Sequence, residues 1–265
     1  MKIFTFLLLL FTFSFAKVYY SKVQPYEIRD ISSNVSGLVL FTDEDMIGKK
    51  LGDKAYIIID DELDKKELQY VQEKLGFLKN MIKINEDVLK NLEKSLEKKQ
   101  DNYEKIIVLR TKSVIEKDKE FYDLVNTQNQ LLSTQKEVQN LKVQMADLKL
   151  KEAYLLRSIN DKNLKAKDFV LYSILVKPGK VVGISTPLAQ IADTSKALLT
   201  IYLDEDDLLN AKEKTVYING KKTEYKISRV LNIADSKNIS KYMAQIIVKA
   251  PKIFSKLAKV ELKDE

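Results

Sequence analysis

The densest group of side chains that could do chemistry is a run of four acids, Asp204-Glu205-Asp206-Asp207. Carboxylate oxygens are the ligands that Ca²⁺ prefers, so such a run is first a candidate calcium site. A calcium-binding loop, however, spaces its ligands along the chain and ends on a glutamate that binds through both oxygens. This run has neither feature, and we interpret it as a solvated turn that follows a strand.

Composition restricts the remaining chemistry. The chain contains no cysteine and no histidine, which are the ligands that zinc, copper and nickel favour. The usual nucleophile–base pairs and imidazole acid–base catalysis are missing for the same reason. We therefore expect no disulfide, no metal and no cofactor, and a protein that is not an enzyme.

The N-terminus is typical of a secretory signal. Lys2 is followed by an apolar run from Ile3 to Phe15, and Ser14-Phe15-Ala16 forms a small-x-small cleavage site. A helix of that length reaches about 20 Å, less than the roughly 30 Å of a bilayer core. Residues 1–16 are therefore predicted to be a cleaved signal peptide, and the mature chain is expected in the periplasm.

The net charge of +7 could indicate a nucleic-acid partner. In the middle third of the chain, however, lysine and glutamate alternate, which is typical of a solvated helix face. Together with the predicted export, this pattern indicates no nucleic-acid partner.

Residues 77–177 contain neither glycine nor proline, which favours long helices. The first part of this region has a heptad seam in which ten of twelve positions are apolar or aromatic, and its polar position Asn85 is of the kind that fixes register. The seam residues are Leu68, Val71, Leu75, Leu78, Ile82, Asn85, Leu89, Leu92, Leu96, Lys99, Tyr103 and Ile106.

A second seam follows with a shoulder at its side formed by Phe121, Val125 and Leu132. Between the seams, Arg110 to Ser113 are polar and break the heptad phase, so we expect an antiparallel hairpin with helices of roughly 70 Å rather than one rod of about 150 Å. The second seam contains Leu124, Thr127, Leu131, Thr134, Val138, Leu141, Met145, Leu148, Glu152, Leu155 and Ile159.

The flanks, residues 18–59 and 168–262, are rich in Val, Ile, Tyr and Thr in short runs, which indicates strands. Thr215 to Ile218, Asn219-Gly220 and Lys221 to Ile227 predict a β-hairpin with a type I′ turn. The order along the chain is strands, a long helical insertion, and more strands.

Two segments on either side of the helices look like halves of one small domain. The first contains Val35-Ser36-Gly37-Leu38-Val39, Gly48 and Leu51-Gly52-Asp53; the second contains Val176-Lys177-Pro178-Gly179-Lys180-Val181 and Thr186-Pro187-Leu188-Ala189. This pattern resembles the split lipoyl-like domain of the membrane fusion proteins, the HlyD family of periplasmic adaptors. The glycines Gly37, Gly48, Gly52 and Gly179 are expected to let the chain turn with positive φ.

The resemblance implies an α+β fold in which a coiled-coil hairpin is inserted in a split lipoyl-like β domain, followed by a small β-barrel. Asp204 to Leu209 and Arg229 to Ile233 are similar to the family's barrel segments. The membrane-proximal domain of larger relatives is expected to be absent. The expected limits are residues 17–60 and 164–195 for the lipoyl-like halves, 61–163 for the hairpin and 196–265 for the barrel.

Some positions depart from the family pattern. Phe169 stands where the opening turn of the second half normally has glycine, which puts the geometry of that turn in doubt. Members that meet a TolC-like channel carry Arg, Leu and Ser at i, i+4 and i+11 of the hairpin tip, where this chain has Lys105, Leu109 and Glu116. The resemblance therefore makes these three residues the candidate channel-docking site.

The resemblance implies a periplasmic adaptor that couples an inner-membrane transporter to a TolC-like outer-membrane channel, as a homo-oligomer of six copies. The cleavable signal favours a resistance-nodulation-division (RND) transporter, whereas the long hairpin favours an ABC or major-facilitator system. A type I secretion adaptor and a structural coiled-coil envelope protein are the alternatives. Asp53-Lys54-Ala55 is similar to the modified lysine of lipoyl carriers, but the hairpin occupies the place where that lysine belongs.

Overall fold

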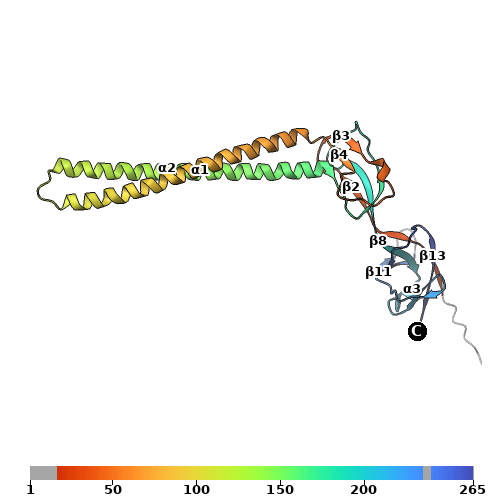
Figure 1. Cartoon of the computed structure of the whole chain (residues 1–265). Coiled ribbons are helices and arrows are strands. Elements are labelled where there is room, and N and C mark those ends of the chain that lie inside the picture. Colours follow the sequence, from red (N-terminus) through yellow and green to blue (C-terminus); the bar gives the residue numbers. More distant parts are fainter. Residues whose placement is uncertain (1–16, 235–239, 265) are drawn as a thin grey trace, which may run out of the picture. The chain divides into compact units, whose positions relative to one another are not determined.

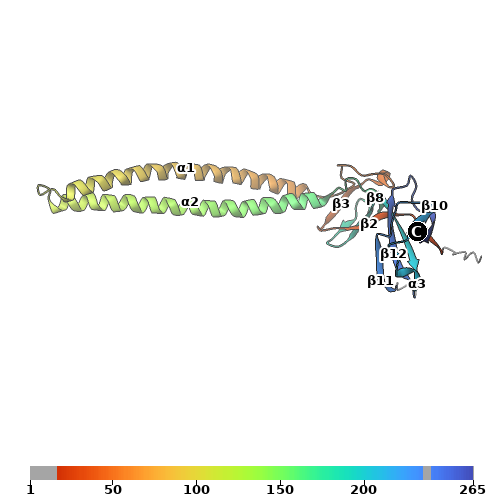
Figure 2. The same ribbon diagram turned by 90° about the horizontal axis from the view of Figure 1, so that it is seen from below.

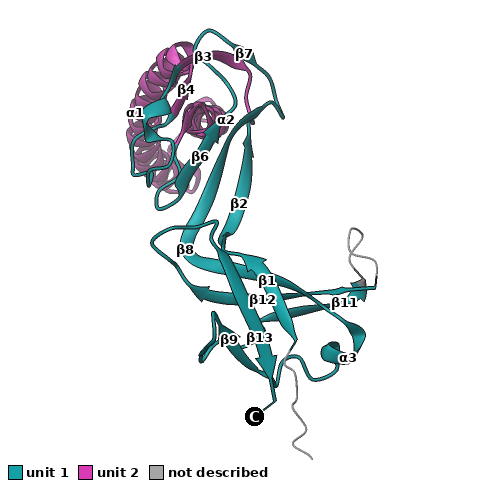
Figure 3. Cartoon of the chain, turned by 90° about the vertical axis from the view of Figure 1, so that its right-hand side faces the viewer, with its two compact units in different colours: residues 1–33, 41–56, 165–265 teal, residues 34–40, 57–164 magenta. Residues whose placement is uncertain are grey.

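A computed structural model describes residues 17–234 and 240–264 of the chain. The predicted signal peptide, residues 1–16, lies outside the described residues. The chain forms two compact units, one made of residues 1–33, 41–56 and 165–265 and the other of residues 34–40 and 57–164 (Figure 3). Within the described ranges, no helix is both long enough and apolar enough to cross a membrane.

The second unit is dominated by two long helices. Helix α1 spans Glu62–Ile107 and helix α2 spans Val114–Lys162, with 46 and 49 residues. At 1.5 Å per residue each helix is about 70 Å long. They lie antiparallel and side by side in both views (Figures 1 and 2), which confirms the predicted hairpin and excludes a single rod.

The heptad seams lie between the two helices. Every predicted seam position of both helices is buried or half-buried, and Val71, Ile82, Val138 and Leu141 are at most 7% exposed. Because a 3.5-residue repeat places each a and d side chain on one face, the sequence pattern dictates this packing. The ion pairs Lys142–Glu86 at 3.1 Å and Lys151–Glu67 at 2.5 Å bridge the helices outside the seam, and Gln72 donates to the carboxylate of the seam residue Glu152 at 3.0 Å.

The base of the hairpin is joined by buried and half-buried polar contacts. Asn163 donates to the Asp61 carboxylate at 2.6 Å, and Asp61 is 6% exposed. Ser158 and Lys162 of α2 both reach the carboxylate of Asp64 in α1, at 2.5 and 3.0 Å. Charged hydrogen bonds of this kind are stronger than neutral ones, so they fix how the two helices meet.

The short strands of the second unit flank this base. Strand β4 (Ile57–Ile59) pairs antiparallel with β5 (Asn163–Leu164) on one side and adjoins β3 (Gly37–Thr42) on the other. Ile57 and Ile59 are fully buried. The strand that enters α1 and the strand that leaves α2 are therefore neighbours in one sheet.

Curled sheets form the first unit. Strand β8 (Pro187–Leu203) is 17 residues long, pairing with β2 and β6 along one part and with β12 along the other. A separate sheet has the order β1-β13-β9-β10. The remaining strands are β1 (Val18–Lys22), β2 (Gln24–Ser32), β6 (Val170–Ile174), β7 (Val181–Val182), β9 (Thr215–Ile218), β10 (Lys221–Lys222), β11 (Arg229–Ala234), β12 (Tyr242–Lys249) and β13 (Leu257–Lys263).

One apolar core lies between these sheets. Leu199, Ile201 and Leu203 of β8 pack with residues of β12 and β13 such as Ile246 and Val260, all at most 1% exposed. The alternation along each strand turns these side chains inward. Two short helices complete the element list, η1 (Glu44–Met46) and α3 (Glu205–Leu208). The expectation of a mixed helix-and-sheet fold with a long hairpin is confirmed.

The four glycines predicted to turn with positive φ differ in their backbone conformation. Gly48 and Gly179 adopt φ of 79° and 88°, as predicted. The prediction is wrong for Gly37 and Gly52, whose φ is not positive. At Gly37 the requirement is close packing, because an added Cβ would lie 2.7 Å from Cγ2 of Ile59, whereas nothing lies within 4 Å of the corresponding point at Gly52.

Two turns have residues with positive φ, one at a position that lacks the expected glycine and one at the predicted Asn-Gly pair. The turn before Phe169 forms although it lacks glycine, because Asp168 adopts the positive φ of 73°. Its N–H donates to the Leu51 carbonyl at 3.1 Å, and the Leu51 N–H donates to the Phe169 carbonyl at 2.7 Å. Asn219 and Gly220 have φ of 50° and 79°, which is the geometry of the predicted type I′ turn. The second strand of that hairpin ends at Lys222, so the predicted extension to Ile227 is wrong.

Candidate functional site

The three predicted docking residues lie around the turn of the helical hairpin. Lys105 is in the last turn of α1, with its side chain 75% exposed and 3.9 Å from Asp101. Leu109 lies in the connection between the helices and is 44% exposed. Glu116 lies in the first turn of α2. The structure therefore brings all three to one end of the hairpin.

Glu116 also holds the turn together. Its backbone N–H donates to Oγ of Ser113 at 3.3 Å, while its carboxylate accepts from the backbone N–H of Ser113 at 2.9 Å. This reciprocal arrangement is a capping box, which satisfies N–H groups that a helix leaves unpaired at its start. Lys112 adds an ion pair to the Glu116 carboxylate at 3.0 Å. The Ser113 backbone hydrogen bond, followed by the contacts with Lys112 and the Ser113 hydroxyl, lowers the pKa of Glu116 to about 2.

A second contact closes the turn from the other helix. Lys117 of α2 donates from its ammonium group to the Ile107 carbonyl at the end of α1, at 2.9 Å. The backbone N–H of Leu109 donates to the Ile106 carbonyl at 3.1 Å and tightens the end of α1. A cation at a helix C-terminus is favourable because the last carbonyls are unpaired. These contacts join the end of α1 to the start of α2 across the turn.

The tip also carries an exposed apolar cluster that our reading of the sequence missed. Exposed loop tips are ordinarily polar, yet aliphatic side chains surround this one. The available signal was apolar residues next to Arg110 to Ser113 that belong to neither heptad seam. The cluster, called here the apolar tip, consists of Ile107 (44% exposed), Val108 (74%), Leu109 (44%), Val114 (72%) and Ile115 (81%).

Farther along α2 lies the predicted shoulder. Phe121 and Leu132 are 44% and 55% exposed, and Val125 is half-buried. Phe121 packs against Tyr103 of α1 with ring centroids 5.7 Å apart and against Tyr122 at 5.8 Å. The shoulder thus leaves apolar surface uncovered.

A longer exposed stripe runs along α1 and was also missed. Its members are spaced by three, four or seven residues, so they share one helix face. A groove of about 440 Å³ beside it is lined by Tyr70, Phe77 and, from α2, Leu148. The stripe, called here the outer stripe, consists of Leu63, Tyr70, Phe77, Met81, Ile84 and Val88, all at least 42% exposed.

The acidic run differs from its predicted character at one position. The Asp207 side chain is 15% exposed and accepts from the Tyr19 hydroxyl at 2.5 Å, from Lys214 at 3.0 Å and from Lys17 at 3.1 Å. Burial would raise the pKa of Asp207, but these hydrogen bonds outweigh it and lower the pKa to about 2. Burial, and then the bond to Asp207, raises the pKa of Tyr19. The interpretation as a wholly solvated turn is therefore wrong at Asp207, which anchors α3 to β1.

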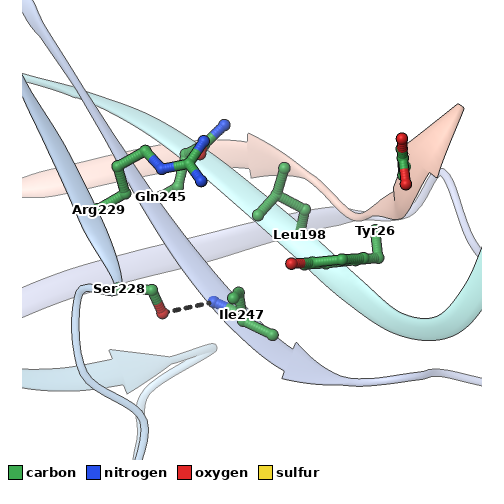
Figure 4. A pocket seen from close by; sticks show the side chains of 7 residues that line it. Tyr26, Leu198, Ser228, Arg229, Gln245 and Ile247 are labelled. Atoms are coloured by element: carbon green, nitrogen blue, oxygen red, sulfur yellow. Dashed lines mark hydrogen bonds between the residues drawn. The ribbon is translucent and has the colours of Figure 1, made fainter.

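The first unit also has a cavity of about 390 Å³ (Figure 4). Ser228 in its wall accepts from the backbone N–H of Ile247 at 3.3 Å, and Glu27 is paired with Arg29 at 2.7 Å. The wall thus gives no nucleophile–base pair of the kind that activates a hydroxyl. Its lining residues are Tyr26, Glu27, Leu198, Ser228, Arg229, Gln245 and Ile247.

Metal and carrier chemistry receive no support from the described part of the chain. Across residues 17–234 and 240–264, no three or more carboxylate, imidazole or thiol side chains are grouped as metal ligands would be. Lys54, the lysine compared with a lipoyl carrier, is exposed in the segment between Leu51 and β4.

Comparison with known proteins gives a likeness in structure only. No protein-family model matches the chain, and no curated protein matches it. The crystal structure of MacA from Actinobacillus actinomycetemcomitans is 17% identical with a TM-score of 0.69, over 94% of this chain and 79% of that one. The membrane fusion protein Spr0693 from Streptococcus pneumoniae R6 is 11% identical with a TM-score of 0.59, over 94% of this chain and all of that one (100%).

A third solved structure, a putative efflux transporter from Bacteroides eggerthii, is 14% identical with a TM-score of 0.54, over 93% of this chain and 68% of that one. At these identities the likeness concerns the fold. The resemblance first noted around Gly37 and Gly179 agrees with it. This chain has the fold of MacA and of the membrane fusion protein Spr0693.

Proposed function

We propose that this chain is a periplasmic adaptor that couples an inner-membrane transporter to a TolC-like outer-membrane channel, so that small molecules leave the cell. The observation that carries the proposal is the apolar tip at the end of a helical hairpin about 70 Å long. Exposed aliphatic side chains on an ordered turn favour a docking surface over a solvated loop. The fold likeness to a membrane fusion protein supports the same role.

In this proposal Lys105 and Leu109 contact the channel, and Glu116 keeps the turn in the docking conformation while presenting its carboxylate edge. The neighbouring Val114 and Ile115, at 72% and 81% exposed, enlarge the apolar contact. Apolar side chains in the centre of a contact with charges at its rim are typical of protein interfaces. The segments 17–60 and 164–195 form the lipoyl-like halves and 196–265 the barrel that faces the transporter.

Several copies act together as a closed ring of six. Identical subunits usually assemble with closed rotational symmetry, and in a ring of six one face of each copy meets a different face of the next. The outer stripe on α1 and the shoulder with Phe121 and Leu132 on α2 provide two such faces. A neighbouring copy that covers these faces would bury their apolar surface. Each Å² removed from water stabilises the assembly by about 25 cal/mol.

The transporter is of the RND class in our preferred version, with an ABC transporter or a type I secretion system as the alternative. Residues 1–16 act as a cleaved signal peptide, and the protein is held at the inner membrane through its transporter. The adaptor performs no catalysis and needs no cofactor. The competing function is that of an envelope tether without transport. The efflux and cross-linking experiments described next separate a tether from an adaptor.

The experiment is efflux in a strain that lacks the adaptor gene, complemented with the parent or with Leu109→Asp. Placing an unpaired charge in an apolar contact costs several kcal/mol, so we expect efflux to fall more than tenfold. Ile115→Asp should behave the same way because its side chain is 81% exposed at the same tip. Equal efflux by parent and both variants, at equal protein level, would contradict the docking role.

Two controls separate docking from folding. Leu109→Met keeps an apolar side chain of similar volume and should retain efflux. Leu92→Asp lies in the seam, so it should lower helicity in circular dichroism, whereas Leu109→Asp should not. Cross-linking of Leu109→Cys to an outer-membrane channel supports the adaptor, and its failure while the ring still forms favours the tether.

A further inference from the structure

One face of the sheet β1-β13-β9-β10 points away from the core. Along β13, Ala258, Val260 and Leu262 are buried in the core, so the alternating residues Leu257, Lys259, Glu261 and Lys263 lie on the opposite face. Register places Tyr20 of β1 opposite Lys259, and Tyr217 of β9 opposite Glu261. These three strands lie side by side (Figure 3).

This outer face carries excess positive charge. Glu261 is paired with Lys259 at 2.7 Å and with Lys263 at 3.1 Å, so it is already shared by two cations. Four exposed lysines on this face and on the loop that leads into β13 have no carboxylate partner among the described residues. They are Lys22, Lys222, Lys252 and Lys256.

Exposed apolar side chains lie among these lysines. Tyr20 is 63% exposed, Leu257 is 68% exposed and Ile253 is 61% exposed. Register places Leu257 directly opposite Lys22 in the β1–β13 ladder. Lysine stems cover apolar surface while their ammonium groups stay in water, so aliphatic, tyrosine and lysine side chains together suit a boundary between water and lipid.

The kind of cation indicates the kind of partner. A protein or nucleotide site that binds individual carboxylates or phosphates generally uses the bidentate fork of arginine. Each of the six cations named on this face and its adjoining loop is a lysine, which acts as a mobile point charge. A diffuse layer of negative charge satisfies such cations without requiring defined hydrogen-bond geometry.

We propose that this face docks on a membrane surface rich in anionic phospholipid headgroups. Lys22, Lys222 and Lys256 lie at the headgroup level, and Tyr20, Leu257 and Ile253 enter the interfacial layer. The contact is independent of the transporter and of the hairpin tip, and it holds the sheet-bearing unit against the bilayer directly.

The test is co-sedimentation of the purified full chain with vesicles of phosphatidylglycerol and phosphatidylcholine in equal parts, compared with vesicles of phosphatidylcholine alone. The ratio of the two partition coefficients measures the preference for anionic vesicles. Residues 1–16, including Lys2, are the same in every variant, so a difference in this ratio between variants comes from the substituted lysines. Each lysine near an anionic surface contributes about a fivefold factor. Lys22→Gln/Lys222→Gln/Lys256→Gln should therefore lower that ratio about 100-fold, and higher salt should lower it in the parent.

The matched control removes the same charge elsewhere. Lys79, Lys98 and Lys119 are exposed on the hairpin and also have no carboxylate partner among the described residues. Lys79→Gln/Lys98→Gln/Lys119→Gln should keep the ratio of the parent within about threefold. The proposal is overturned if the parent shows no preference for anionic vesicles, if the Lys22 triple variant keeps its preference while folded by circular dichroism, or if the control triple loses as much.

Discussion

Ser113 and Glu116 cap the second helix of the hairpin reciprocally, with backbone-to-side-chain hydrogen bonds of 3.3 Å and 2.9 Å in opposite directions. This pair stands at the base of the apolar tip. It explains why aliphatic side chains can be presented on an ordered turn, because the cap fixes the backbone that carries Val114 and Ile115. The cap and part of the proposed docking surface thus share the four-residue segment from Ser113 to Glu116.

The cap predicts how the tip responds to mutation. Ser113→Ala removes the acceptor for the Glu116 N–H, so the start of α2 should fray at a cost of about 1 kcal/mol. Hydrogen exchange of residues 114–117 should accelerate while exchange at Val138 and Leu141 is unchanged. Ser113→Asp keeps an acceptor at the N-cap and should restore slow exchange. Equally slow exchange in Ser113→Ala would show that the cap contributes nothing.

The same pair predicts the pH dependence of the tip. The pKa of Glu116 is lowered from its ordinary 4.5 to about 2, so its stabilisation is complete above pH 4.5 and is lost as pH falls towards 2. Hydrogen exchange at the start of α2, corrected for its intrinsic pH dependence, should therefore show increased opening only below about pH 4.5. Glu116→Gln should remove that pH dependence. A transition that persists unchanged in Glu116→Gln would assign it to another group.

Asp207 should be important for the stability of the sheet-bearing unit. Asp207→Asn removes a carboxylate that accepts from Tyr19, Lys17 and Lys214 and is 15% exposed. Charged hydrogen bonds contribute about 1.5–3 kcal/mol each when a partner is lost, so thermal unfolding should occur several degrees lower. Asp206→Asn, at the exposed neighbouring position, is the control and should leave the midpoint unchanged. Equal midpoints for both variants would contradict the anchoring role of Asp207.

Much of the hairpin could be predicted from sequence because its determinants are local and periodic. A heptad repeat specifies which side chains meet, and even the polar seam positions Asn85, Lys99 and Glu152 lie half-buried where the repeat places them. The function of one polar seam residue was less predictable. The Asn85 amide donates to the Met81 carbonyl of its own helix at 3.0 Å, so this contact does not reach across the seam.

Features that depend on distant contacts could not be predicted. Nothing in the run from Asp204 to Asp207 indicates which acid meets Tyr19, because that partner lies far away in the chain. The turn before Phe169 was uncertain because a family glycine is missing, and Asp168 takes the positive φ in its place. The apolar tip was overlooked because periodicity identifies buried faces, and exposed apolar residues outside a seam leave no periodic signal.

Alanine substitutions at Gly37 and Gly52 should affect stability differently, although both glycines lie in the segment that resembles a lipoyl-like half. Gly37→Ala would place Cβ 2.7 Å from Cγ2 of the fully buried Ile59, so we expect a loss of about 1–3 kcal/mol from overpacking. Gly52→Ala meets nothing within 4 Å and has no positive φ, so it should be neutral or slightly stabilising. Chemical denaturation of the two variants measures the difference, and equal stabilities would refute the packing argument.

The outer stripe gives the last prediction, which concerns assembly. Tyr70, Phe77 and Ile84 are 63%, 70% and 55% exposed and lie one heptad apart on one face of α1. Replacing all three with serine removes apolar surface that we propose a neighbouring copy covers, so the ring should dissociate or require a higher protein concentration to form. Analytical ultracentrifugation, with the parent alone and with its transporter and channel, measures this.

Since the three side chains lie outside the seam, the helicity of the variant should equal that of the parent. Phe121→Ser/Leu132→Ser, on the exposed shoulder of α2, tests whether the shoulder provides the opposite face, and it should weaken assembly in the same way. A parent that is strictly monomeric under every condition, or a Tyr70 triple variant that assembles as well as the parent, would contradict a ring built on this stripe.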